Sequence, residues 1–268
     1  MYLSCLLIDV GTNPDRPRPG RLWLRNRYRV HQRLCMGFPY RDTKDHDRDF
    51  LKPYKPCGFR DPRPVYCAAP AVQHQQPCAT VQPAPLHVPR DAEHNFLFRV
   101  DPQPGGRVVI LVQSAVEPDW DYAFHNAGHL LAAPPEIKTV EQRIKQGDQF
   151  RFRLLANPTK RLRKDSRDSR GDPVNRKWVG KRVGVGSEDL ENWLARRAHP
   201  GGFHVRRLAS IQRGFIYVNK GERLRYRSAQ YEGILEVTEP DRFRDTLVRG
   251  IGSAKAFGFG LLSVVPVR

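Results

Sequence analysis

Residues 249–263 read Arg-Gly-Ile-Gly-Ser-Ala-Lys-Ala-Phe-Gly-Phe-Gly-Leu-Leu-Ser, between a helix-like segment and an apolar run. Its glycines are Gly250, Gly252, Gly258 and Gly260. Glycine permits positive φ and carries no Cβ, so backbone N–H groups here can approach a large anionic ligand closely. The spacing is neither the GxxxxGK[ST] of a P-loop nor a GxGxxG that opens a helix after a strand. The stretch therefore predicts a glycine-shaped loop around which the rest of the chain is organised.

Two interpretations of this loop stay open. The loop follows a helix, and a helix C-terminus carries partial negative charge, so a bound phosphate would need positive charge from side chains. Arg249 and Lys255 are the local candidates for that charge. In the alternative, Gly250 ends the helix and the remaining glycines only turn the chain tightly into an edge strand.

Length and charge narrow the class of protein. The chain has 268 residues, enough for two modest domains, and a formal net charge of +18 that is spread along its length. The electrostatic field of so positive a protein favours binding to a polyanion. No apolar run approaches the roughly 20 residues of a membrane-spanning helix. Residues 1–10 alternate like a strand and lack the features of a signal peptide, and the five cysteines are unevenly placed. We therefore expect a cytoplasmic protein without a disulfide framework.

The first part of the chain predicts the element order β-α-β-β-α-β. Apolar or alternating runs predict strands at 2–8, 95–100, 107–113 and 149–155, and the second and third of these form a hairpin. A weak helical turn at 140–145 supplies the second helix. Alternation of apolar and basic residues makes 149–155 the last strand of this half.

The helix after the first strand carries two candidate catalytic residues. Val30, Leu34 and Phe38 recur at helical spacing and are expected to face the core. Tyr28 and His31 are three residues apart, which places a phenol and an imidazole side by side on one helix face.

Residues 43–94 are rich in proline and have no period, which predicts an inserted, partly disordered loop. The loop contains possible metal ligands: Cys57, Cys67, His74, Cys78 and His87. Their separations lack the close CxxC pairs of structural zinc sites. We therefore expect solvated side chains in the loop and no metal.

The second part repeats the same element order. Strands are expected at 181–185, 215–218, 231–237 and 261–265, with a tight turn at 219–221. Ser187 is the expected N-cap of a helix that packs Leu190, Trp193 and Leu194, and Pro240 opens the second helix. The sequence thus predicts an α+β fold with two tandem ferredoxin-like domains of RRM topology. The expected boundaries are 1–163 for the first domain, 164–177 for a charged linker and 178–268 for the second domain.

Four motifs together carry a resemblance to a known family. They are Met1-Tyr2-Leu3-Ser4, Tyr28-x-x-His31-x-x-Leu34 with Phe38-Pro39, Arg151-Phe152-Arg153-Leu154-x-x-Asn157-Pro158-x-Lys160, and the glycine pattern from Gly250 to Ser263. With these motifs in this order, the chain resembles the CasE-type endoribonucleases of type I-E CRISPR systems. The 43–94 insert is not part of the family pattern.

The resemblance implies metal-independent cleavage of CRISPR repeat transcripts at the repeat hairpin, with no cofactor, and retention of the product in the multisubunit Cascade complex. It implies that His31 is catalytic and that Tyr28 assists. The chemistry agrees, because attack by a 2′-OH needs proton transfers near neutral pH, to which histidine is suited. Expected RNA contacts are Arg27, Arg153, Lys160, Arg249, Gly250, Gly252, Lys255, Gly258 and Gly260, although each basic side chain could equally be solvated. Phe257 and Phe259 are expected to seat the loop on the sheet rather than to stack on bases.

Two other functions stay open at this point. A non-catalytic RNA-binding subunit of the same architecture would share the charge, the fold and the glycine loop. A zinc-dependent nuclease would use the cysteines of the insert.

Overall fold

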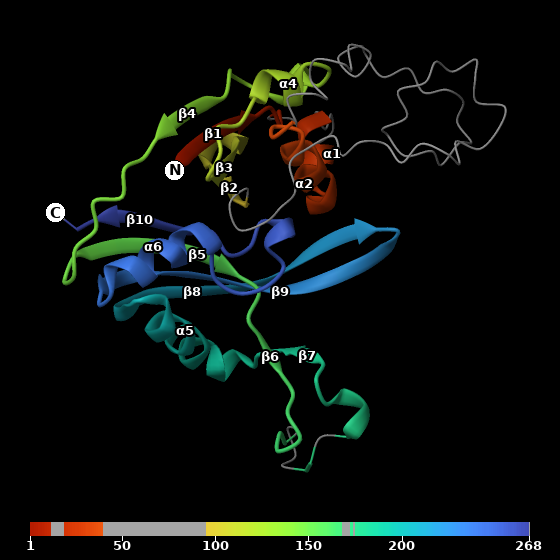
Figure 1. Cartoon of the computed structure of the whole chain (residues 1–268). Coiled ribbons are helices and arrows are strands. Elements are labelled where there is room, and N and C mark those ends of the chain that lie inside the picture. Colours follow the sequence, from red (N-terminus) through yellow and green to blue (C-terminus); the bar gives the residue numbers. More distant parts are fainter. Residues whose placement is uncertain (12–18, 40–94, 168–171, 174, 268) are drawn as a thin grey trace, which may run out of the picture.

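The computed structural model describes residues 1–11, 19–39, 95–167, 172–173 and 175–267 (Figure 1). The insert expected at 43–94, with its cysteines and histidines, lies outside the described residues. The described chain forms two four-stranded antiparallel sheets and a two-stranded ribbon. No described helix is both long and apolar enough to cross a membrane.

The first sheet has the strand order β2-β3-β1-β4. Its strands are β1 Tyr2–Ile8, β2 Phe96–Pro102, β3 Val108–Ser114 and β4 Glu136–Thr139. Its helices are α1 Pro19–Leu24, α2 Arg27–Cys35 and α4 Trp120–Phe124, with 3₁₀ turns η2 Pro104–Gly106 and η3 Gly128–Leu130. The expected hairpin is confirmed, because β2 and β3 pair antiparallel with Phe96 opposite Ser114.

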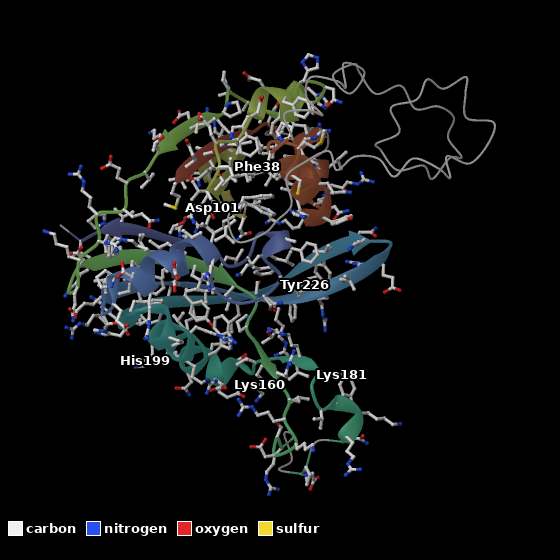
Figure 2. All side chains as sticks on the ribbon, in the orientation of Figure 1. Phe38, Asp101, Lys160, Lys181, His199 and Tyr226 are labelled. Atoms are coloured by element: carbon white, nitrogen blue, oxygen red, sulfur yellow. The ribbon has the colours of Figure 1, made fainter. Side chains whose placement is uncertain are left out.

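The expected core face of α2 is confirmed. Val30 and Leu34 are fully buried, and Phe38 just beyond the helix is 5% exposed. The Phe38 ring stacks on Phe96 of β2, with centroids 5.0 Å apart, and Figure 2 shows Phe38 among the packed side chains of the first sheet. Burial of these apolar side chains fixes α2 on one face of the sheet.

The second sheet has the strand order β10-β5-β9-β8. Its strands are β5 Gln149–Ala156, β8 Phe203–Lys220, β9 Glu222–Val237 and β10 Leu262–Pro266, and the ribbon pairs β6 Thr159–Arg161 with β7 Arg182–Gly184. Its helices are α5 Leu190–Ala198 and α6 Pro240–Arg249, with 3₁₀ turns η4 Arg176–Trp178, η5 Ser187–Asp189, η6 His199–Gly201 and η7 Lys255–Phe257.

Both sheets follow the ferredoxin-like plan. In each, the strand that begins the unit lies between the third and fourth strands, and two helical segments pack against the sheet. The predicted fold class of two tandem ferredoxin-like domains is confirmed.

The strand expected to end the first half is placed differently. Residues 149–156 form β5, which pairs with β9 and β10 and so begins the second sheet. The fourth strand of the first sheet is β4, whose side chains are all exposed. A short exposed strand has no apolar alternation, whereas β5 alternates clearly, so the periodicity favoured the wrong strand. We accordingly place the boundary between the two units at 140–148, ahead of the expected linker.

Three further expectations about local structure are wrong. Residues 140–145 form no helix, and the second helix of the first unit is α4. The run at 181–185 does contain a strand, β7, but this strand pairs with β6 in the ribbon and is not part of the second sheet. Ser187 begins the turn η5, and the N-cap of α5 is Asp189, which makes no side-chain capping bond. Leu190, Trp193 and Leu194 are nevertheless buried as expected, because the apolar spacing sets the packed face.

The two units meet through the face of the first sheet that its helices leave uncovered. Leu97, Arg99 and Gln113 lie on this face and are at most 5% exposed. The Arg99 guanidinium forms an ion pair with Asp101 at 2.7 Å and donates to Ser263 Oγ of β10 at 2.9 Å. Gln113 Nε2 donates to the Leu247 carbonyl of α6. These buried polar contacts join the sheets directly.

Candidate functional site

One face of α2 carries Tyr28, His31 and Cys35, which follow one another at helical spacing. The Cys35 sulfur lies 3.6 Å from both His31 ring nitrogens. The His31 ring also lies 5.8 Å from the ring of Phe96, at an angle of 30°. Because Cys35 and Phe96 are buried, these contacts hold the imidazole against the edge of the first core. We call this face of α2 the histidine stripe.

The helix begins at a capping residue that also contacts the second unit. Asn26 Oδ1 accepts from the backbone N–H of Tyr28 at 3.1 Å, as expected for an N-cap. The same side chain donates to the Asn219 carbonyl at 3.0 Å and accepts from the Asn219 N–H at 3.3 Å. Asn219 lies at the tip of the β8–β9 hairpin, so one side chain caps α2 and ties it to that hairpin.

The hairpin also brings a positive charge to the histidine stripe. Lys220 Nζ lies 5.3 Å from the centre of the Tyr28 ring, within the range of a cation–π contact. Both strands of the hairpin are long, and in Figure 1 it extends beyond the rest of its sheet toward α2. The tyrosine and the lysine therefore lie side by side although they belong to different units.

The glycine loop borders the stripe on another side. Its turn η7 packs against α2 and β2. Gly250 and Gly258 have φ of +70° and +85°. A Cβ on Gly250 would lie 2.7 Å from both the Gly260 carbonyl and Leu97, and a Cβ on Gly258 would lie 3.1 Å from Phe98. Only glycine fits these positions, because the loop has both an unusual backbone and close neighbours.

Both interpretations of the loop keep support. Backbone bonds from Gly250 to Thr246 and from Gly260 to Leu155 tie the loop to α6 and β5, which fits a helix end that leads into a strand. Ala254 is the sole non-glycine with positive φ among the residues that the structure describes, at +61°. Such a conformation is typical of functional sites, where surrounding contacts hold it in place.

The two phenylalanines of the loop seat it on the second sheet, as expected. Phe259 is fully buried. Tyr226 of β9, labelled in Figure 2, lies 5.1 Å from the Phe257 ring and 6.4 Å from the Phe259 ring. These rings support the loop and present no open stacking surface from Phe259.

The Arg27 side chain is half-buried, with one end of its guanidinium turned into the protein. Its Nη1 is buried without a hydrogen-bond partner. Burial lowers the pKa of Arg27 to about 10, and the negative charge of Asp101 partly offsets that shift. The buried Nη1 faces the protein, so an RNA contact of Arg27 stays a prediction that only the exposed part of the side chain could serve.

The other predicted RNA contacts divide into two groups. Lys255 Nζ donates to the Arg249 carbonyl, and the Arg249 side chain lies 4.0 Å from Asp245. Both residues belong to the glycine loop beside α2. Arg153 pairs with Glu232 at 2.8 Å within the second sheet, and Lys160 lies in the ribbon on the far side of that sheet (Figure 2). The structure therefore does not place Arg153 and Lys160 in the histidine stripe.

The sequence reasoning missed Asn26, Cys35 and Lys220. Asn26 precedes the helix and is a preferred N-cap residue, so its capping role was readable from the sequence. Its bond to Asn219 and the position of Lys220 depend on contacts between residues almost 200 positions apart, and no local pattern carries that information.

Within the described ranges, no group of three or more His, Cys, Asp or Glu side chains is arranged to hold a metal ion. The insert cysteines lie outside those ranges, and the proposal of a zinc nuclease finds no support in the described residues.

Comparison with known proteins gives consistent similarities. The family described as CRISPR associated protein matches residues 68–266. The CRISPR-associated endoribonuclease Cse3 of Thermus thermophilus is 35% identical over 194 residues, covering 66% of this chain and 82% of the relative. The Cascade subunit CasE of Escherichia coli is 30% identical over 182 residues, with 66% and 84% covered.

A solved structure of Thermus thermophilus Cse3, bound to an RNA that represents a pre-cleavage complex, matches with a TM-score of 0.61. It is 26% identical and covers 99% of this chain and 98% of that one. The family match begins at residue 68, beyond α2, so that match carries no information on Tyr28 or His31.

Proposed function

This chain belongs to the Cse3/CasE family of CRISPR-associated endoribonucleases, and we propose that it cuts CRISPR repeat RNA beside a hairpin and retains the product within a Cascade complex. Support comes from the relatives, of which one is a Cascade subunit and another is known bound to RNA. The net charge of +18 agrees with a polyanionic substrate. We retain the cytoplasm as the proposed location.

The observation that carries the enzymatic proposal is the position of His31. Its ring is held by Cys35 and Phe96 on the first unit, while the hairpin tip and the glycine loop of the second unit flank the same helix. A titratable side chain at such a junction can act on a strand that contacts both units. This arrangement supports a catalytic role for His31 rather than a purely structural one.

We propose that the nucleophile is the substrate's own 2′-OH. Its attack on the adjacent phosphate requires removal of the hydroxyl proton and delivery of a proton to the departing 5′-oxygen. His31 carries out one of these transfers, because an imidazole exchanges protons near neutral pH. The products would be a 2′,3′-cyclic phosphate and a 5′-OH, and the reaction needs no metal ion.

Tyr28 and Lys220 have complementary roles in this proposal. The Tyr28 hydroxyl lies on the same helix face as His31 and donates to a phosphate oxygen. The Lys220 ammonium beside the Tyr28 ring stabilises the negative charge that develops on the phosphate during the attack. Two units thus supply one site, with the proton-transferring His31 and Tyr28 on α2 and the cation on the β8–β9 hairpin.

Two histidines of the chain, one in the candidate site and one outside it, provide the test and its control. Single-turnover cleavage of repeat hairpin RNA in a strong chelator is measured for the wild type, His31→Ala and His199→Ala. His199 is exposed at the end of α5, away from α2. We expect His31→Ala to lose about 10² to 10⁴-fold in rate, as typical for removal of a general acid or base. His199→Ala should cleave like the wild type.

Equal cleavage rates for His31→Ala and the wild type would show that His31 is not catalytic and that the active site lies elsewhere. A wild-type protein that binds the hairpin tightly and never cuts it would favour the alternative, a non-catalytic RNA-binding subunit. Loss of wild-type cleavage in the chelator would bring back a metal-dependent nuclease.

A further inference from the structure

A concave site lies beside the glycine loop, with a cavity volume of about 480 Å³. Its lining includes Thr159, Arg182, Phe215, Arg225, Arg227 and Ser253. We call it the arginine pocket. Guanidinium groups come from β7 and β9, and no acidic side chain is among the residues that line the cavity. The volume falls within the range of pockets that hold small ligands.

Hydroxyl and amide groups form one wall of the arginine pocket. Thr159 Oγ1 lies 3.2 Å from Ser253 Oγ, and Arg182 Nη1 donates to Thr159 Oγ1 at 3.4 Å. Asn157, which is buried, donates to Ser253 Oγ at 3.4 Å. Hydroxyls that rotate together with a guanidinium can donate to the oxygens of a phosphate.

An aromatic platform forms the opposite wall. Phe215 of β8 is 49% exposed, so its ring is accessible to a ligand. The Arg225 guanidinium lies 4.7 Å from the centre of its ring. An exposed aromatic ring beside a guanidinium plane provides two surfaces on which a nucleobase can stack.

The arginine pocket lies one loop away from the histidine stripe. Ser253 and Ala254 line the pocket, while the next residues form η7, which packs against α2. The pocket opens on the ribbon side of the second sheet, so an RNA that contacts both His31 and the pocket must pass around the glycine loop. The strained backbone of Ala254 lies in that loop.

We propose that the arginine pocket holds one unpaired nucleotide of the RNA strand that passes His31. The guanidinium and hydroxyl wall takes the phosphate, and the base stacks on Phe215 and Arg225. A paired stem presents its backbone as a convex surface and keeps its bases stacked, so it does not fill a concave pocket with an aromatic wall. Stacking accepts every base, so the pocket adds affinity without sequence preference. This inference rests on the proposed RNA substrate.

The hairpin offers a matched control for the test. Tyr217 and Arg223 form the same arrangement two residues nearer the tip, also with 4.7 Å between the guanidinium and the ring centre. Neither residue lines the arginine pocket. The double variants Phe215→Ala with Arg225→Gln, and Tyr217→Ala with Arg223→Gln, remove equivalent groups inside and outside the pocket.

Affinity is measured by fluorescence anisotropy with two RNAs that carry a 2′-deoxy nucleotide at the cut. One has unpaired nucleotides on both sides of the stem, and the other is trimmed to the blunt stem. We expect the Phe215 and Arg225 double variant to bind the flanked RNA about tenfold more weakly, as typical for loss of one stacked base, and the blunt stem within twofold of the wild type. The Tyr217 and Arg223 variant should change both affinities by the same factor.

Equal losses on both RNAs would show a contact with the stem and overturn the proposal, as would no loss on the flanked RNA. If the wild type binds and cuts hairpin RNA, but the pocket variant loses no more affinity for the flanked RNA than for the blunt stem, only the pocket assignment fails. If the wild type neither binds nor cuts any repeat hairpin, the proposed function itself fails.

Discussion

The two ferredoxin-like units share a strand order but differ in the hairpin between their second and third strands. In the first unit, β2 and β3 have 7 residues each. In the second unit, β8 has 18 residues and β9 has 16. The long hairpin reaches the helix α2 of the first unit, while the short one ends at the edge of its own sheet.

This difference shows where a shared fold acquires a site. The first unit supplies the titratable side chains on α2, whereas the second supplies the hairpin tip and the glycine loop around them. Neither unit alone has all the parts of the candidate site. In the proposed mechanism, function belongs to the junction between the units rather than to the fold that each one repeats.

The strongest expected effect tests whether the units are held together by a buried charge. Arg99→Met leaves the Asp101 carboxylate, whose side chain is 12% exposed, without its partner. Removal of one member of a buried ion pair costs about 3–5 kcal/mol. Arg27→Met removes a half-buried guanidinium that has no hydrogen bond at Nη1 and interacts with Asp101 through charge alone, so we expect a smaller loss of stability than for Arg99→Met. Urea unfolding of both variants gives the comparison, and equal losses would contradict it.

The next prediction compares the stability cost of replacing a glycine in the glycine loop with that of replacing one in the turn η2 of the first unit. Gly250 has φ +70° and ψ 169°, a conformation that is essentially restricted to glycine. Gly250→Ala adds backbone strain and a clash with Leu97 and Gly260, and should cost about 2–4 kcal/mol. Gly105→Ala in the turn η2 also has positive φ, but no atom lies within 4 Å of the added Cβ.

Gly105→Ala should therefore lower the free energy of unfolding by about 1–2 kcal/mol, which reflects backbone strain alone. Thermal unfolding of both variants measures the difference. If the two alanine variants unfold at the same temperature, the close packing of the loop between the units contributes nothing to stability.

A smaller effect separates helix capping from the contact between units at Asn26. Asn26→Asp keeps the oxygen that accepts from Tyr28 but loses the donor to the Asn219 carbonyl. Asn26→Ala loses both and should cost about 1 kcal/mol of stability. We expect Asn26→Asp to unfold like the wild type and to cleave RNA several-fold more slowly, because the hairpin no longer holds α2. Normal cleavage by Asn26→Asp would show that capping alone matters.

The sequence predicted those parts of the fold that local patterns determine. Apolar spacing identified α2, and apolar or alternating runs identified β1, β2 and β3 and the hairpin of β2 with β3. The assignment of β5 failed because alternation reports a half-buried strand and does not report which sheet the strand joins. Pairing of β5 with β9 spans about 80 residues and depends on the whole second unit.

Local patterns also account for part of the candidate site. Tyr28 and His31 were found because their spacing places them on one face of a helix. The partial burial of Arg27 could not be foreseen, since it results from packing around α2 that no local pattern encodes. Phe215 was read as part of a strand, and its exposure follows from a hairpin that extends beyond the helices of its unit.

The smallest expected effect on stability concerns the charges of the glycine loop. Arg249 and Asp245 form an exposed pair at 4.0 Å, so neutralising Arg249 and Lys255 together should change the free energy of unfolding by less than about 1 kcal/mol. If the loop contacts phosphates, the slope of log affinity against log salt should become shallower by about 0.7 for each lost contact with a single strand. An unchanged slope would leave the loop as a turn into β10 only.

The most direct test of the account uses a substrate that lacks one hydroxyl. Repeat hairpin RNA with a 2′-deoxy nucleotide immediately 5′ of the cut is incubated with the protein in a strong chelator. We predict that cleavage is abolished while hairpin affinity stays within a few-fold, because one hydroxyl contributes only about 1 kcal/mol to binding. The unmodified RNA should give a 2′,3′-cyclic phosphate and a 5′-OH. Efficient cutting of the deoxy substrate would contradict attack by the 2′-OH and the role proposed for His31.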